Sequence, residues 1–236
     1  MKVSTEVKIA GFRKTSLIDY PDNISTVLFT QGCNCRCGYC HNPGLIAKTA
    51  EKDYMDLKYF WNFLNERGHL LDGVVITGGE PTLQDNLVSF VNEIKNRDMK
   101  VKLDTNGSGY KIIRKLIEKK LVDYLAMDIK VPFKKYKNLS NDEDIVSNIK
   151  KSIDLILGSE IKHEFRTTVV PEMHTKNDIE KIVKSINGAD KYYIQNFRPE
   201  ITLDPEFGKR RKFPESKLKK FKNIAEKYID IVEIRN

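Results

Sequence analysis

Four cysteines crowded into eight residues constrain this 236-residue chain more than any other feature of its sequence. Cys33, Cys37 and Cys40 have the spacing C-x3-C-x2-C, and Cys35 lies between the first two. Three thiolates at this spacing can hold three irons of a [4Fe–4S] cube from one loop, which leaves the fourth iron open. Because electron-transfer clusters usually have four cysteine ligands, an open iron indicates chemistry at the cluster. We therefore predict one [4Fe–4S] cluster, with Cys33, Cys37 and Cys40 as its ligands and as the catalytic residues.

Other uses of clustered cysteines fit the sequence less well. A disulfide framework would spread its cysteines across a small secreted domain. Structural zinc normally takes two separated ligand pairs, and although His41 could complete a set, no second pair follows in the chain. The role of Cys35 stays open. As a small apolar residue it can pack inside the loop, or it can serve as an alternative ligand or a redox thiol.

Length and composition are those of an ordinary soluble globular protein. A chain of 236 residues fits one domain of barrel size or two small domains. Hydrophobic residues make up 40% of it and charged residues 31%, which is ordinary for a globular protein. Without a run of about 18 apolar residues, no membrane span is expected. The first residues lack the apolar core of a signal peptide, which predicts a cytoplasmic location.

The charge balance is basic, with 41 basic and 33 acidic residues and a net charge of +8. Most basic residues are lysines scattered through the expected helices, which argues against a nucleic-acid partner. The densest run extends from Lys209 to Lys212. This run is either a solvated face or a docking surface where complementary charge speeds the encounter with an acidic electron donor or partner protein.

Short β-branched runs alternate with amphipathic helical patterns, which is typical of successive βα units. Six such units are too few for an eight-stranded barrel and suit an open doubly wound sheet or a partial barrel. One helical stripe is formed by Leu83, Leu87, Val91 and Ile94. No linker rich in Pro, Gly or Ser divides the chain, so we expect one domain over 1–236, with a core of about 14–199 and a C-terminal helix and strand within about 214–236. The expected strands are 25–30, 73–77, 100–103, 122–127, 162–170, 191–195 and a terminal strand at 229–234.

Polar, glycine-rich segments follow the C-terminal ends of the expected strands. The doubly wound sheet and the partial barrel both place their active sites at these ends. Gly78 and Gly79 permit a close backbone approach, and Glu80 offers an acceptor for a cationic amine. Each segment also has a simpler interpretation as a tight turn, an Asx turn or a surface ion pair. Together these segments are expected to place carboxylates, a hydroxyl and an ammonium around one opening at the C-terminal ends of the strands. The segments are Thr77–Pro81, Asp104–Gly107, Asp128–Lys130, Val169–Pro171 and Gln195–Pro199.

In this order the motifs resemble the glycyl-radical-enzyme activating enzymes of the radical S-adenosylmethionine (SAM) superfamily. The resemblance covers about 14–199, and its N-terminal part is most similar to the anaerobic ribonucleoside-triphosphate reductase activating protein. Pyruvate formate-lyase activating enzyme is a close relative of that protein. The stretches that carry the resemblance are Lys14–Pro21, Tyr39–Pro43 with the cysteines before it, Thr77–Pro81, Asp104–Gly107 and Met127–Lys130.

The resemblance implies a partial (β/α)6 barrel, a parallel sheet with outer helices, in which Cys33, Cys37 and Cys40 ligate the cluster. Asp19, His41 and Asn42 match positions where the family meets the peptide or the cofactor. The positions matching SAM contacts are Tyr39, Gly78, Gly79, Glu80, Asp104, Lys130, Arg166 and Gln195. The positions matching a monovalent cation site are Asp104, Thr105, Met127 and Asp128.

The implied activity is reductive cleavage of SAM to a 5′-deoxyadenosyl radical, which generates a glycyl radical on a partner enzyme. The implied partners are a glycyl radical enzyme, here anaerobic ribonucleotide reductase, and a low-potential electron donor such as flavodoxin or ferredoxin. One alternative is a radical SAM enzyme like 7-carboxy-7-deazaguanine synthase, which acts on a small molecule. Another is a non-catalytic iron–sulfur protein that transfers electrons or binds nucleic acid.

Overall fold

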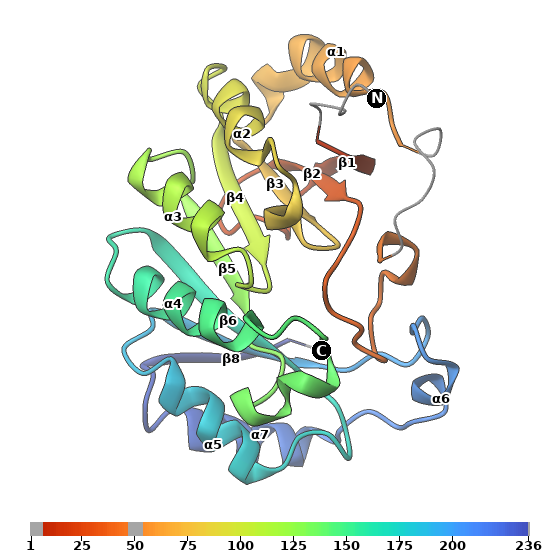
Figure 1. Cartoon of the computed structure of the whole chain (residues 1–236), viewed down its shortest axis with the longest axis vertical. Coiled ribbons are helices and arrows are strands. Elements are labelled where there is room, and N and C mark those ends of the chain that lie inside the picture. The colour runs from red at the N-terminus through yellow and green to blue at the C-terminus, as the bar shows by residue number, and fades with distance from the viewer. Residues whose placement is uncertain (1–6, 47–53, 236) are drawn as a thin grey trace.

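The computed structural model describes residues 7–46 and 54–235 of the chain. Within these residues, eight strands form one sheet, and their order across the sheet is their order in the sequence (Figure 1). The first strand is antiparallel to the second, and every later pair of neighbours is parallel. The strands are β1 Ile9–Ser16, β2 Ser25–Thr30, β3 Gly73–Gly78, β4 Lys100–Thr105, β5 Tyr124–Asp128, β6 Lys162–Val169, β7 Lys191–Asn196 and β8 Ile231–Arg235.

The long helices that connect the parallel strands cover one face of this sheet (Figure 1). Right-handed crossovers leave their helices on one face when every new strand is added in the same direction. A doubly wound sheet reverses that direction and carries helices on both faces. The observed strand order therefore selects the partial barrel from the two expected architectures. The helices are α1 Leu57–Arg67, α2 Leu87–Lys95, α3 Tyr110–Glu118, α4 Ile145–Leu157, α5 Lys176–Ser185, α6 Pro205–Gly208 and α7 Glu215–Ala225, with 3-10 turns η1 Pro43–Leu45, η3 Gly68–Leu70, η4 Pro81–Leu83 and η5 Phe133–Asn138.

Apolar side chains bury both faces of β2 and β3. Leu28, Ile76 and Leu103 are fully buried in the main core, which the strands share with the helices. The alternate residues Val27 and Val75 belong to a second, smaller cluster on the inner face of the sheet. Strands buried on both sides by apolar residues have nearly continuous apolar sequences, as β2 and β3 have in their middle residues, whereas β4 alternates apolar residues with Lys and Asp. Polar residues also occur on the inner face, including Lys102 in β4 and Glu164 in β6, and those at the C-terminal strand ends line the polar site.

Two details of the fold differ from the sequence-based expectation. The edge strand β1 was not predicted, because Gly11 and the exposed Arg13 and Lys14 break any apolar alternation. Charged residues on an edge strand also discourage pairing with other chains. Leu83, expected in the second helical stripe, lies in the turn η4 instead, and α2 begins only at Leu87.

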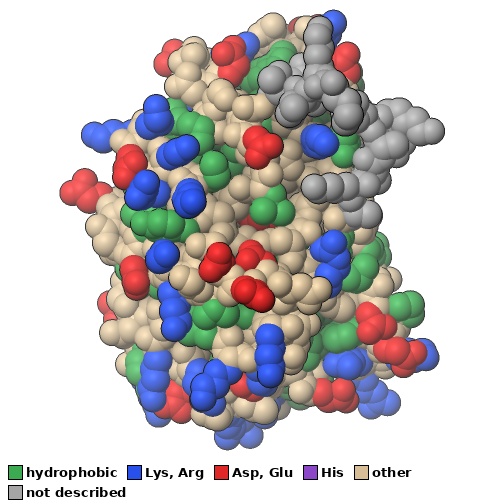
Figure 2. Space-filling model, viewed as in Figure 1, with side chains coloured by type: hydrophobic (Ala, Val, Ile, Leu, Met, Phe, Trp, Pro, Cys, Tyr) green, Lys and Arg blue, Asp and Glu red, His purple; other side chains and the backbone are tan. Residues whose placement is uncertain are grey.

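The visible surface carries charges of both signs. On the face shown in Figure 2, Lys and Arg side chains are interspersed with Asp and Glu side chains rather than gathered into one continuous basic track. Across residues 7–46 and 54–235, the structure contains no helix with the length and apolar character needed to cross a bilayer.

The burial pattern makes a testable prediction for the central strand β3. Replacing the fully buried Ile76 by alanine leaves a cavity between sheet and helices, so the free energy of unfolding should fall by about 2–5 kcal/mol. Ile231, on the edge strand β8, is 43% exposed, and its alanine variant should lose less than about 1 kcal/mol. Urea unfolding followed by circular dichroism measures both. Equal losses would contradict the assignment of Ile76 to the core.

Candidate active site

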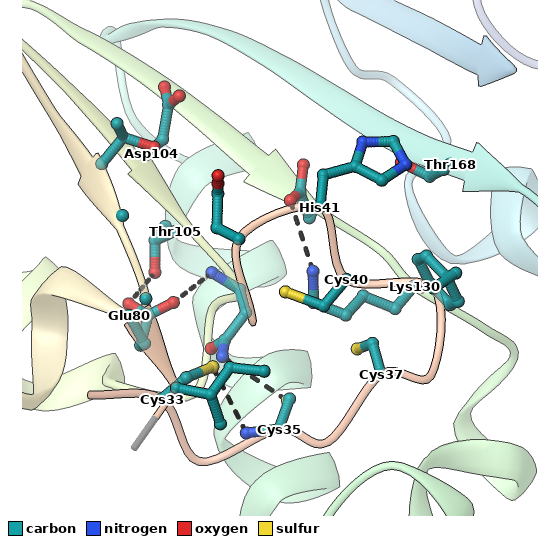
Figure 3. Close-up of a pocket in the computed structure, with 18 of the residues that line it drawn as sticks. Cys33, Cys35, Cys37, Cys40, His41, Glu80, Asp104, Thr105, Lys130 and Thr168 are labelled. Atoms are coloured by element: carbon teal, nitrogen blue, oxygen red, sulfur yellow. Dashed lines mark hydrogen bonds and ion pairs between the residues drawn. The ribbon is translucent and has the colours of Figure 1, made fainter. Parts of the chain in front are cut away.

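The loop that follows β2 carries all four cysteines and lies across the C-terminal ends of the strands (Figure 3). Backbone hydrogen bonds fix it at several points. The amide of Gly32 donates to the carbonyl of Leu45 at 2.7 Å, and the carbonyl of Gly32 accepts from the amide of Glu80 at 2.8 Å. Farther along, the amide of Arg36 donates to the carbonyl of Leu139 at 2.7 Å. The cysteines are thus presented by a loop that is bonded to the strand ends and to the turn after β5.

One cavity lies between this loop and the strand ends. Figure 3 shows Cys33, Cys37 and Cys40 on the loop side, with Glu80 and Asp104 on the strand side. Two segments separated by tens of residues in the sequence therefore face each other across one space. The lining consists of Cys33, Cys35, Cys37, Tyr39, Cys40, His41, Asn42, Ile46, Thr77, Gly78, Gly79, Glu80, Asp104, Thr105, Asn106, Asp128, Lys130, Arg166 and Thr168.

Cys33, Cys37 and Cys40 line the cavity from separate positions on the loop, with Cys35 hydrogen-bonded to Cys33 and Cys37 (Figure 3). In the described part of the chain, no three side chains of His, Cys, Asp or Glu come close enough to hold a single metal ion. A tetrahedral zinc site needs its ligands to meet at one ion. A cube is held by thiolates that bind separate irons, so it needs thiols that are spread out. Three thiols presented by one loop are compatible with an iron–sulfur cube.

The four thiols differ in acidity. A hydrogen bond with Cys35 lowers the pKa of Cys37 to about 6, against the effect of burial, and the charge of Lys130 lowers it further. The pKa of Cys33 is also lowered, mainly by its hydrogen bond with Cys35, whereas burial raises the pKa of Cys40. The same bonds to Cys33 and Cys37 raise the pKa of Cys35. These directions favour thiolates at Cys33 and Cys37 and protonated thiols at Cys35 and Cys40 in the cluster-free protein.

Glu80 joins the end of β3 to the end of β4. Its side chain is buried, and Oε1 accepts hydrogen bonds from the hydroxyls of Thr82 at 2.5 Å and Thr105 at 2.7 Å. Oε2 accepts from the amide of Asn106 at 2.6 Å. Burial raises the pKa of Glu80, and these hydrogen bonds oppose the rise. A carboxylate oxygen can accept two hydrogen bonds, so Oε2 can also receive a donor from a ligand in the cavity.

Charges of alternating sign form the strand side of the cavity. Arg166 on β6 lies between two carboxylates, with Nη1 at 3.3 Å from Asp104 and Nε at 2.8 Å from Asp128. Lys102 Nζ lies 2.5 Å from Asp104, and Lys130 Nζ lies 3.4 Å from Asp128. Burial would raise the pKa of both carboxyl groups, but Arg166 and the neighbouring lysines outweigh it and hold both pKa values below their ordinary range. Both carboxylates are therefore ionised at neutral pH.

The cavity contains all three predicted cluster ligands and every predicted SAM-contacting residue except Gln195. Gln195 lies half-buried on β7, outside the lining. Met127, from the expected cation site, is buried with its side chain against Gly107 and does not line the cavity. Asp19 lies in the hairpin between β1 and β2, where it accepts a hydrogen bond from Ser16 at 2.5 Å.

Four lining residues were not among the predicted site residues. Thr168 follows Arg166 by two positions on β6, so the strand period alone could have placed it on the same face. Thr77 and Asn106 belong to motifs that the sequence singled out, and strand alternation does not mark them separately. Ile46 reaches the cavity from the turn η1, whose return toward β2 has no signal in the sequence.

Comparison with known proteins places the chain in a family. The Radical SAM superfamily matches residues 27–186, a span that contains the cysteine loop and strands β3 to β6. Members of this superfamily use a [4Fe–4S] cluster and SAM, and this chain carries a cysteine motif in the corresponding loop. Both the donor set and the charges of the cavity are compatible with these two groups.

Individual relatives narrow the assignment. The chain is 38% identical over 237 residues to "Putative glycyl-radical enzyme activating enzyme MJ1227" of Methanocaldococcus jannaschii, covering 96% of this chain and 95% of the relative. It is 30% identical over 201 residues to the pyruvate formate-lyase-activating enzyme of Clostridium pasteurianum, covering 78% of this chain and 79% of that enzyme. The crystal structure of QueE from Escherichia coli shares the fold, with a TM-score of 0.58 at 14% identity over 98% of this chain and 94% of QueE. The chain therefore belongs to the radical SAM superfamily and, within it, to the glycyl-radical-enzyme activating enzymes.

Proposed function

We propose that this chain activates an anaerobic ribonucleotide reductase by generating a glycyl radical on it, using one [4Fe–4S] cluster and SAM. The observation that carries the proposal is the cavity itself. Three thiols of one fixed loop face a group of carboxylates and cations at the strand ends. The choice of ribonucleotide reductase among glycyl radical enzymes is supported by the N-terminal stretch Lys14–Pro21, which resembles the activating protein of that enzyme.

In this proposal Cys33, Cys37 and Cys40 hold the cluster, and Cys35 remains beside it as a hydrogen-bond donor. The lowered pKa of Cys37 supports its role, because thiolates rather than thiols bind iron. When bound, the cluster and SAM supply a reducing electron and a 5′-deoxyadenosyl radical, which is chemistry that no side chain provides. What the chain supplies is placement of these groups and of the substrate glycine.

The strand side of the cavity is proposed to hold SAM. Glu80, with the backbone of Gly78 and Gly79, receives the amino group, and Asp104 and Lys130 bind the remaining polar groups. The mixture of charges supports this, since SAM combines a sulfonium and an amine with a carboxylate and a ribose diol. These side chains are held by hydrogen bonds and ion pairs within the chain, so little reorganisation accompanies binding.

Tyr39, also in the lining, is proposed to pack near the adenine, with Arg166 at the far side of the cavity. In this proposal a glycine-bearing loop of the partner enters the open mouth of the partial barrel. A cytoplasmic location belongs to the same proposal, because a reduced cluster with an open iron requires a reducing compartment.

The first prediction concerns the four cysteines. After anaerobic reconstitution with iron and sulfide, dithionite and SAM should yield 5′-deoxyadenosine from the wild-type protein. Cys33→Ala, Cys37→Ala and Cys40→Ala should each reduce this yield to background, because each removes one iron ligand. Cys35→Ala is the matched control and should retain most of the yield, since its thiol is a donor and not a ligand. A Cys35→Ala variant as inactive as the other three would overturn the ligand assignment.

The same preparation tests the partner. The reconstituted enzyme is mixed with anaerobic ribonucleotide reductase or with pyruvate formate-lyase, and electron paramagnetic resonance shows which of them acquires a radical. A radical on the reductase supports the proposal. A radical found only on pyruvate formate-lyase would instead identify that enzyme as the partner. Turnover that requires a small pterin substrate and no protein would instead support the deazaguanine-synthase alternative.

The electron donor is proposed to dock on the α6 segment, residues 197–213, which packs directly on the cysteine loop. The amide of Asp204 donates to the carbonyl of Gly38 at 2.9 Å, and the ring of Phe207 lies against Gly38, where a Cβ atom would collide with it. Arg210 lies over the ring of Phe207 at 3.9 Å. The basic run that begins at Lys209 is therefore beside the proposed cluster, where an acidic flavodoxin or ferredoxin would bring its own redox centre close.

A charge-reversal experiment tests this surface. Arg211 and Lys212 are exposed, and Arg211→Glu combined with Lys212→Glu should slow reduction by flavodoxin roughly tenfold at low ionic strength, because steering is lost. Lys219→Glu with Lys220→Glu makes the same charge change on α7, which packs on α5, and should have little effect. Reduction by dithionite should be unchanged in both variants. Equal slowing in both double variants, or a wild-type reduction rate that does not change with salt, would contradict the proposed docking surface.

A further inference from the structure

The carboxylates expected to hold a monovalent cation already have cations from the chain. Asp104 Oδ1 pairs with Lys102 Nζ at 2.5 Å, and Oδ2 lies 3.3 Å from Arg166 Nη1. Asp128 Oδ1 lies 2.8 Å from Arg166 Nε, and Oδ2 lies 3.4 Å from Lys130 Nζ. All four oxygens of the two carboxylates thus face a positive group of the protein. Lys102, Arg166 and Lys130 therefore take the positions around these oxygens that a metal cation would need, and Arg166 also lies 3.8 Å from Glu164.

The other two expected ligands are also committed elsewhere. The hydroxyl of Thr105 donates to Glu80 at 2.7 Å and accepts from the amide of Gly107 at 3.0 Å. The side chain of Met127 is fully buried on the opposite side of its strand, against Gly107. The side chains at the four matched positions therefore do not form a set of free oxygen ligands, which a hard cation requires. The side chains present leave no oxygen of their own free for a metal cation at this place.

Lys102 is the residue that makes this site differ from the expected cation site. It lies two positions before Asp104 on β4, so both side chains are on the inner face of the sheet. Its side chain is only 3% exposed, and its ammonium also lies 6.0 Å from the centre of the Tyr124 ring. A buried lysine charge persists only when it is paired, and the pairing here is with the carboxylate that faces the cavity.

We infer that the ammonium of Lys102 takes the place of a monovalent metal ion as the counter-ion of Asp104, so that this enzyme binds SAM and cleaves it without sodium or potassium. The inference deepens the proposed function, because Asp104 is one of the groups proposed to hold SAM. A tethered ammonium differs from a dissolved ion in being present at every salt concentration. Asp104 is consequently held in one position before any ligand binds.

The test compares potassium chloride with tetramethylammonium chloride at equal ionic strength, since the organic cation is too large for a carboxylate pocket. It uses the full-length protein, Lys102→Met, and Lys100→Met as the matched control. Lys100 is on the same strand, but it is exposed and its ammonium donates to Asn23 at 2.7 Å. Two readouts are taken: thermal unfolding of the cluster-free protein, and SAM affinity and 5′-deoxyadenosine yield of the reconstituted protein.

The wild type and Lys100→Met should show the same melting temperature in both salts, and their 5′-deoxyadenosine rates should agree between salts within about twofold. Lys102→Met leaves Asp104 Oδ1 open, so potassium should raise its melting temperature. In tetramethylammonium its SAM affinity and rate should fall by about tenfold, and potassium should restore most of both. A wild-type rate that drops tenfold without potassium overturns the inference, as does a Lys102→Met variant that responds to potassium no more than Lys100→Met.

Two further outcomes are also decisive. If Lys102→Met does not fold in either salt, the wild-type comparison decides: equal rates in the two salts support the inference, and a loss without potassium overturns it. If the wild type makes no 5′-deoxyadenosine in either salt, the proposed function fails. The inference about Lys102 then stands or falls with thermal unfolding of the cluster-free variants, which does not depend on SAM cleavage.

Discussion

The active site depends on a continuation of the β2–β3 pairing beyond the ends of these strands. The amide of Gly79 donates to the carbonyl of Thr30 at 2.9 Å, and the amide of Glu80 donates to the carbonyl of Gly32 at 2.8 Å. These bonds hold the start of the cysteine loop in register with the Gly-Gly-Glu turn. A Cβ atom at position 79 would collide with the carbonyl of Gly32, so this close approach requires glycine there. The glycine therefore serves packing between two chain segments, in addition to lining the cavity.

The same cavity is lined by several buried charges. Their pairing orients the side chains, and their removal from water is unfavourable for folding. Removing ions from water is unfavourable unless each finds a partner, and a network that loses one member leaves another charge unpaired. Arg166 is central because its guanidinium serves Asp104 and Asp128 from one position and also lies 3.8 Å from Glu164. Only a planar group with several donors can do this, so a lysine would not replace it. The network orients the polar side chains before any ligand arrives.

Much of this architecture could be predicted from the sequence because the strong signals are local. The strand Ser25–Thr30 was predicted at its observed bounds, and the later strands within a few residues, since short β-branched runs between helical patterns are a local signal. The edge strand β1 could not be found in this way, because half of its surface is solvent and its pattern is polar. The site motifs were located because parallel strands bring their C-terminal ends together, whatever their separation in the sequence.

The ion or ligand that a motif binds is harder to predict than the position of the motif in the fold. The acidic residues Asp104 and Asp128 show why. Their matching positions in the family imply a cation, yet the charge that each carboxylate meets is set by lysines close to it in the sequence and by Arg166 on β6. Arg166 follows Asp104 by 62 positions in the sequence, and Lys102 has the pattern of an ordinary lysine in a strand. Its burial is visible only once the inner face of the sheet is assembled. Similarity of motif therefore transfers the positions of these carboxylates, whereas their electrostatic partners follow from the three-dimensional packing of this particular chain.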